Sequence, residues 1–201
     1  MKTKLTILML ISFAIIINTT SAQDKPESKN EIRLGYGVLT APEMANSLMS
    51  VWPAIGMNIF KDTITDYRCS FYGAPDFEYH RHLARWVAIG VSMSVNPIST
   101  IIKGKSGMEF SYNYYLLTLM PRVDFYYLKK GIFSMYSGVQ VGASYIFWQD
   151  RNGGSHTNDS GFSAAFHINA FGIRVGKDIG AFMEWGYGFR GVVNFGVSGK
   201  F

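Results

Sequence analysis

Hydrophobic side chains recur at every second position over long stretches of this chain, and this period constrains the fold more than any other feature. Over residues 86–96 one face carries only apolar residues, namely Val87, Ile89, Val91, Met93 and Val95. The opposite face carries mainly Gly, Ala, Ser and Asn. Successive side chains of a β-strand point to opposite faces of the sheet, so a period of two predicts strands with one apolar face.

The same alternation, followed along the rest of the chain, predicts eight strands. They span residues 32–38, 69–81, 86–96, 110–128, 133–148, 162–175, 181–189 and 192–201. In the sixth strand the apolar positions change parity between Ile168 and Phe171, which predicts a β-bulge near Asn169 and Ala170. Pro121 has no backbone N–H to donate to a sheet, and it indicates an irregularity in the fourth strand.

The N-terminal segment predicts export across a membrane. Lys2 and Lys4 precede an apolar run at 5–17, and small polar residues follow at 18–22. A membrane-spanning helix needs about 20 apolar residues, so this shorter run is typical of a cleaved signal peptide. We therefore expect a signal peptide at 1–22, a flexible leader at 23–30 and a single β-domain at 31–201.

Composition indicates which face of the strands points inward. Charged residues make up 16% of the chain, below the roughly 25% of soluble domains. A sheet face in contact with water is usually rich in Lys and Glu, whereas the polar face here consists mainly of small residues. The single cysteine, Cys69, excludes an intramolecular disulfide. These features predict a barrel with small polar residues inside and apolar residues facing lipid, where only a closed sheet satisfies its backbone.

The connections between the strands alternate in length. Tight turns are predicted at 82–85, 129–131 and 176–180, and the opposite connections fall at 40–68, 97–107, 149–160 and near Arg190. Short turns on one side and longer loops on the other are expected of outer-membrane barrels. Thr40, Pro42 and Glu43 match the start of a capped helix that runs to about Ser50. The expected fold is all-β: a closed, eight-stranded, antiparallel, up-and-down transmembrane β-barrel with a short helix in the first extracellular loop.

With these features the chain resembles the small outer-membrane β-barrel domains of the OmpA and OmpX type. The resemblance rests on Ser21, Ala22 and Gln23 at the end of the signal, on the closing run at 171–201, and on the terminal Phe201. In that family a C-terminal aromatic on the lipid-facing parity is part of the insertion signal, which implies the same role for Phe201. The resemblance also implies location in the cell outer membrane, with membrane lipid and the barrel-assembly machinery as partners.

Charged residues on the polar parity predict a network inside the barrel. Its expected members are Arg122, Asp124, Glu184, Arg190 and Lys200. The interior of an eight-stranded barrel is just wide enough for side chains to fill, so this network is expected to plug the lumen. No large pore is therefore expected.

Two other groups of residues have a chemical interpretation. Glu78, His80 and His82 project from one strand face and belong to the residue types that bind zinc. The alternative is a polar lumen patch without metal. His167 shares its parity with Ser163, and some outer-membrane barrels modify lipid with a His and a Ser. Four residues along a strand separate these two by about 13 Å, so hydrogen bonding in the lumen is the alternative.

The leading functional prediction is a non-enzymatic barrel whose loops serve envelope integrity or contact a surface partner that the sequence does not identify. Two alternatives of other classes are an outer-membrane lipid-modifying enzyme and a soluble ligand-binding barrel. No cofactor is expected. Nucleic-acid binding is not expected either, because Lys and Arg are dispersed along the chain without a recognition motif.

Overall fold

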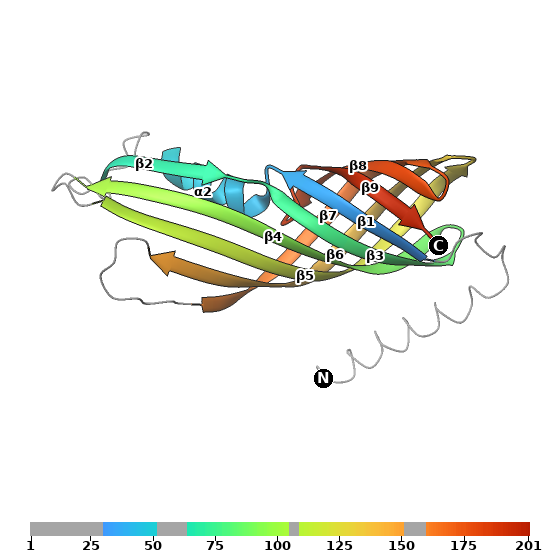
Figure 1. The fold of residues 1–201 in the computed structure, drawn as a ribbon, viewed down its shortest axis with the longest axis horizontal. Helices are drawn as coiled ribbons and strands as arrows, with labels where there is room; N and C mark the ends of the chain where they lie inside the picture. Colours follow the sequence, from blue (N-terminus) through green and yellow to red (C-terminus); the bar gives the residue numbers. More distant parts are fainter. Residues whose placement is uncertain (1–29, 52–63, 105–108, 151–159) are drawn as a thin grey trace, which may run out of the picture.

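The computed structural model describes residues 30–51, 64–104, 109–150 and 160–201, and these form a β-barrel with one helix, α2 (Figure 1). The elements are β1 (Asn30–Val38), α2 (Ala41–Val51), β2 (Ile64–Phe71), β3 (Ala74–Ala84), β4 (Val87–Gly104), β5 (Glu109–Lys130), β6 (Phe133–Asp150), β7 (Ser160–Gly176), β8 (Ile179–Gly188) and β9 (Val193–Lys200). The predicted signal peptide at 1–22 lies outside the described residues, as does all of the predicted leader except Asn30.

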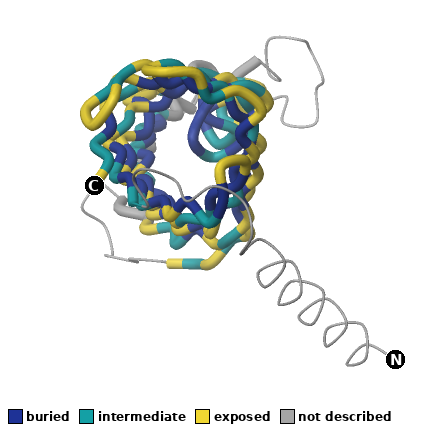
Figure 2. Tube along the Cα trace, turned by 90° about the vertical axis from the view of Figure 1, so that its right-hand side faces the viewer, coloured by how far each residue is buried: buried dark blue, intermediate teal, exposed yellow. Residues whose placement is uncertain are grey.

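Backbone pairing closes the sheet into a ring. β1 pairs antiparallel with β9 on one side and with β3 on the other. β2 and β3 both pair with β4, so they are two segments of one interrupted strand. Eight antiparallel strands therefore enclose a lumen, which Figure 2 shows end-on. The prediction of a closed eight-stranded barrel with a short helix after the first strand is confirmed.

The two ends of the barrel differ. One end, here called the turn end, holds the short connections β3–β4, β5–β6 and β7–β8 together with Asn30 and the C-terminal Phe201. Backbone hydrogen bonds join Asn30 and Phe201 in both directions, at 3.1 and 3.0 Å. The opposite end, called the loop end, holds α2 and the β8–β9 connection (Figure 1).

The predicted strand at 69–81 is interrupted, because Gly73 adopts a left-handed backbone conformation with φ of 67°. A non-glycine residue rarely adopts this conformation, so Gly73 allows the chain to break between β2 and β3. Two contacts hold the break in place. Glu43 Oε1 accepts a hydrogen bond from the Gly73 N–H at 3.0 Å, and the Tyr36 hydroxyl donates to the Tyr72 carbonyl.

The predicted bulge in the sixth strand is confirmed, since the register of β7 with β8 shifts between Asn169 and Phe171. The expected irregularity at Pro121 takes another form. Pro121 pairs in regular register with Val91, and the β5–β6 ladder skips it without a shift. The register shift in β5 lies instead between Tyr126 and Leu128. Proline therefore interrupts hydrogen bonding locally but leaves the strand alignment intact.

The prediction of a loop at 97–107 is wrong for most of its length, because β4 continues to Gly104. Pro97 pairs with Tyr115 on β5, and the following residues pair with β2 on the other side. A strand with partners on both edges tolerates one proline. These partners could not be inferred from the sequence, where the proline and the weaker alternation indicated a loop. The β4 and β5 strands consequently extend far toward the loop end (Figure 1).

The helix α2 begins with the capping box expected from the sequence. The Thr40 N–H donates to Glu43 Oε2 at 2.8 Å, and the Glu43 N–H donates to Thr40 Oγ1 at 3.3 Å. Asn96, whose side chain points into the lumen, donates to Thr40 Oγ1. These bonds attach the start of α2 to the barrel wall. No helix in the described segments is long and apolar enough to cross a membrane.

Inward-pointing side chains are mainly polar or small, and many of those that point outward are large and apolar. On β4, Ser92, Ser94 and Asn96 are at most 2% exposed, while Val91, Met93 and Val95 between them are 36–44% exposed. Figure 2 shows the buried positions lining the inside of the ring. This orientation is the reverse of that expected of a soluble ligand-binding barrel.

Candidate functional site

Ionisable side chains from five strands and from the β8–β9 connection meet in the interior of the barrel. We call this group the lumen cluster, and each member is at most 6% exposed. Its members are Glu31, Arg33, Asp76, Glu78, His80, Arg122, Asp124, Arg174, Glu184 and Arg190. Several lie two positions apart on one strand, as in Glu31 with Arg33 and Arg122 with Asp124. Side chains at this spacing share a face, so each strand delivers its charges to the same side of the wall.

Glu184 on β8 receives three guanidinium groups. Its Oε1 lies 3.1 Å from Arg33 Nη1 and 3.1 Å from Arg122 Nη2, and its Oε2 lies 2.9 Å from Arg190 Nη1. The Tyr136 hydroxyl also donates to Oε1, at 2.8 Å. A single carboxylate therefore connects residues from β1, β5, β6 and the β8–β9 connection.

Glu78 on β3 is a second point of convergence. Its Oε1 lies 2.5 Å from Arg122 Nη1 and 2.6 Å from Arg190 Nη1. Its Oε2 lies 2.8 Å from His80 Nε2. The other ring nitrogen of His80 is 3.0 Å from Asp124 Oδ2, which is within ion-pair range but outside hydrogen-bond geometry. The cluster contains four arginines and five carboxylates, so opposite charges are nearly balanced within it.

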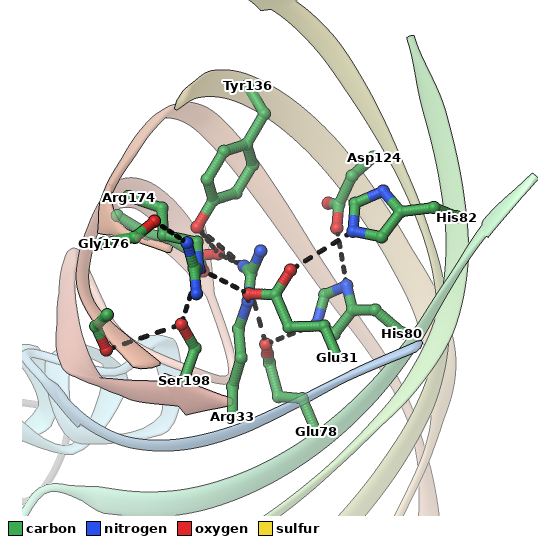
Figure 3. Close-up of polar contacts among 12 residues, drawn as sticks. Glu31, Arg33, Glu78, His80, His82, Asp124, Tyr136, Arg174, Gly176 and Ser198 are labelled. Carbon is green, nitrogen blue, oxygen red and sulfur yellow. Dashed lines mark hydrogen bonds and ion pairs between the residues drawn. The ribbon is translucent and has the colours of Figure 1, made fainter. Parts of the chain in front are cut away.

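Arg33 on β1 reaches across the lumen, as Figure 3 shows. Its Nε lies 2.8 Å from Glu31 Oε1, while Nη1 and Nη2 donate to the hydroxyls of Tyr136 and Tyr126 at 2.7 and 2.9 Å. The guanidinium carbon also lies 4.7 Å from the centre of the Tyr136 ring, within the range of a cation–π contact. Strands β1 and β6 are four strands apart in either direction around the ring, so Arg33 joins opposite walls of the barrel.

The network continues to the turn end. Glu31 Oε2 lies 3.2 Å from His82 Nε2, and His82 Nδ1 lies 3.2 Å from Lys129 Nζ. Arg174 pairs with Glu31 Oε1 at 3.1 Å, and its Nη atoms donate to backbone carbonyls in the β7–β8 turn, including those of Gly176 and Lys177 (Figure 3). The cluster thus contacts the strand wall and one of the short turns.

Glycines next to the cluster leave room for its side chains. A Cβ atom on Gly138 would lie 2.1 Å from Asp124 Oδ1, and one on Gly172 would lie 2.7 Å from the Tyr136 ring. Neither distance is compatible with a methyl group unless the neighbour moves. The small residues on the polar face are therefore explained by the bulk of the charged and aromatic side chains beside them.

The structure places four of the predicted network residues in the lumen cluster, namely Arg122, Asp124, Glu184 and Arg190. Lys200 is half-buried at the turn end and makes no ion pair within the described part of the chain. Sequence analysis missed Glu31, Arg33, Asp76 and Arg174 as cluster members. A signal was present, because Glu31 and Arg33 alternate with the apolar residues of the first strand.

The three residues considered as zinc ligands take different partners. Glu78 and His80 belong to the lumen cluster, where two arginines occupy one oxygen of Glu78. His82 contacts Glu31 and Lys129. Among the residues that the structure describes, no group of three or more His, Cys, Asp or Glu is arranged to hold a metal ion.

His167 and Ser163 both lie on β7 and share its lumen-facing parity, but no hydrogen bond joins them in the described structure. His167 is 1% exposed and pairs across the sheet with Gln140 and Gly188. Ser163 pairs with Ser144, and its hydroxyl donates to the adjacent carbonyl of Ala164 at 3.3 Å. Within the described part of the chain, neither ring nitrogen of His167 has a hydrogen-bond partner. The geometry thus does not show a nucleophile with its base.

The charged side chains of the lumen cluster bind one another. Each carboxylate contacts a guanidinium or imidazole of the same chain. In addition, Arg33 donates to two tyrosine hydroxyls and Arg174 donates to turn carbonyls. Such a network connects the strands that surround it. No protein-family model matches the chain, and no curated protein matches it.

Proposed function

We propose that this protein is an integral outer-membrane β-barrel with a plugged lumen and a structural or surface-interaction role. The observation that carries the proposal is the inverted polarity of the barrel, with a charged cluster inside and large apolar side chains outside. A barrel of this polarity needs an apolar medium around it. Lipid is that medium, and the predicted signal peptide favours export to an outer membrane.

The outer wall supports a lipid environment. Phe162 is 81% exposed, Val141 is 69% exposed and Phe201 is 63% exposed. Soluble monomers rarely expose a contiguous apolar surface, because it promotes aggregation in water. In a bilayer the same side chains contact acyl chains. Closure of the ring also leaves no unpaired sheet edge where the eight strands meet, as a bilayer requires.

Aromatic residues at the outer surface fit this proposal. Tyr127, Phe147, Trp185 and Phe201 are each exposed, and Tyr145 is half-buried against Phe147 and Phe162. Outer-membrane barrels carry girdles of aromatic residues where the apolar band meets the headgroups. Phe201, with its aromatic ring exposed at the end of β9, fits the proposed insertion signal.

The lumen cluster supports a role without a large pore. Arg33, Arg122 and Arg190 converge on Glu184 inside a barrel whose interior is just wide enough for side chains. A water-filled channel would require these ion pairs to separate. We therefore assign contacts with a surface partner to the loop end, where a rigid wall carries the longer connections and α2.

Membrane fractionation tests the location. The chain is expressed with its own N-terminus in a bacterium that has two membranes. We expect it in the outer-membrane fraction, extractable only with detergent, with its N-terminus at Gln23 after processing. Before heating, the folded barrel should migrate differently on a denaturing gel than after heating. Recovery of the folded protein in the aqueous fraction would overturn the proposal.

Planar-bilayer recording tests the plug separately. The purified barrel should give no large stable conductance, because the cluster fills the lumen. Reproducible large channels from the refolded protein would contradict a plugged lumen while leaving the membrane location intact.

A further inference from the structure

Basic side chains gather at the turn end of the barrel. Four are exposed, and we call them the turn-end basic group: Arg81, Arg85, Lys130 and Lys177. Lys129 and Lys200 are half-buried at the same end. Among the described residues at this end, Asp178 is the one exposed acidic residue, since Glu31 is fully buried in the lumen cluster. The exposed surface of this end is therefore strongly positive.

Exposed apolar side chains lie within two residues of two of these cations. Trp86 follows Arg85 and is 44% exposed, and its ring stacks on Phe125 with centroids 6.4 Å apart. In the β7–β8 turn, Ile179 is 82% exposed and lies two residues after Lys177. The β3–β4 and β7–β8 turns thus each expose a cation together with an apolar side chain, which is an amphipathic arrangement.

Two of the cations project from strands on the outer wall. Arg81 lies on the outward parity of β3, between Asn30 on β1 and Ile89 on β4. Lys130 lies at the end of β5, and its cross-strand partner is Phe133 on β6. Long basic side chains at such positions place their aliphatic stems along the apolar wall and their charges toward the polar rim.

We propose that the turn-end basic group binds the phosphate groups of anionic phospholipids in the leaflet that surrounds this end of the barrel. This inference rests on the proposed membrane location and adds a lipid class to it. The cations meet the charge of the headgroups, while the neighbouring apolar side chains enter the acyl region. A soluble anionic polymer would satisfy the cations but would leave Trp86 and Ile179 uncovered.

Native mass spectrometry tests the proposal. The full-length processed protein is reconstituted in vesicles of phosphatidylcholine and phosphatidylglycerol in equal amounts and then released in mild detergent. The wild type should retain phosphatidylglycerol in preference to phosphatidylcholine. The variant R81Q/R85Q/K130Q/K177Q should lose this preference. The ratio of retained phosphatidylglycerol to retained phosphatidylcholine should fall about five-fold for each cation removed. Because the contact is ionic, added salt should weaken retention in the wild type.

Two control variants separate charge from structure. The variant R81K/R85K/K130R/K177R keeps the charge and should keep the preference for phosphatidylglycerol. Arg68 is exposed on β2 toward the loop end, and R68Q removes one cation far from the turn end, so it should retain the preference as well. If the quadruple glutamine variant does not fold, R85Q/K177Q replaces it, because both positions lie in turns and outside the strand pairing.

The outcomes distinguish this inference from the proposed function. A wild-type protein that inserts in vesicles but retains both lipids equally overturns the inference and leaves the membrane location standing. Equal retention by the wild type and the glutamine variant also overturns it. A wild-type protein that does not associate with vesicles overturns the proposed function itself.

Discussion

The two halves of the lumen are held by different interactions. The lumen cluster connects strands that are far apart around the ring, such as β1 with β6 through Arg33 and Tyr136. Toward the loop end, short neutral side chains make local bonds. Thr118 on β5, for example, donates to Ser144 on the adjacent strand β6 at 2.9 Å.

This difference shows what charges add to a closed barrel. Backbone hydrogen bonds join only neighbouring strands, so they leave the shape of the cross-section undetermined. Guanidinium groups that reach Glu184 from several strands fix the distance between opposite walls. The half with neutral side chains lacks such ties among the described residues. The two halves should therefore respond differently to substitution.

Glu184→Gln should have the largest effect, because it leaves three arginines with one carboxylate fewer in a buried site. Removing one partner of a buried ion pair costs about 3–5 kcal/mol. We expect the free energy of unfolding to fall by this amount in urea titrations of the protein in vesicles, followed by tryptophan fluorescence.

Thr118→Val is the matched substitution in the other half, since it removes one neutral hydrogen bond in the lumen. Its expected cost is about 1 kcal/mol. If the two variants lose the same small amount of stability, then the charged half does not hold the barrel more firmly than the neutral half.

Gly138→Ala should have an intermediate effect, because its new methyl group would overlap the carboxylate of Asp124 and crowd the Val123 carbonyl, 3.0 Å away. Overpacking of this kind costs about 1–3 kcal/mol. The urea titration used for Glu184→Gln measures it. Gly161→Ala is the control toward the loop end, where a Cβ would meet nothing within 4 Å, and it should leave stability unchanged. Equal stability of the two alanine variants would refute the crowding that we infer in the lumen cluster.

Glu43→Ala should have an effect as small as that of Thr118→Val, and a local one. It removes the bonds from Glu43 to the N–H groups of Thr40 and Gly73, which hold the start of α2. Loss of such a cap costs about 1 kcal/mol. Hydrogen exchange should accelerate in α2, while exchange in β8 and β9 stays unchanged. Met44→Ala keeps the capping box, so hydrogen exchange in α2 should not accelerate in this control. Faster exchange in Met44→Ala would mean that lost side-chain packing, and not the lost cap, explains the result for Glu43→Ala.

The sequence alone determined the elements whose causes are local. Alternation predicted the strands, the parity change predicted the bulge beside Asn169, and Thr40 with Glu43 predicted the capped helix, because each signal depends on residues close together in the chain. The polar face also identified Arg122, Asp124, Glu184 and Arg190 as a group.

Only the tertiary structure decided what depends on distant partners. Pairing with β2 extends β4 past Pro97, and the left-handed Gly73 divides β2 from β3. Arg33 meets Glu184 across 151 positions of sequence. Closure of the ring brings such residues together, and no local pattern encodes which charges will share one interior. The alternation in the sequence therefore determines which face of each strand points inward. The closed barrel determines which side chains on those faces meet.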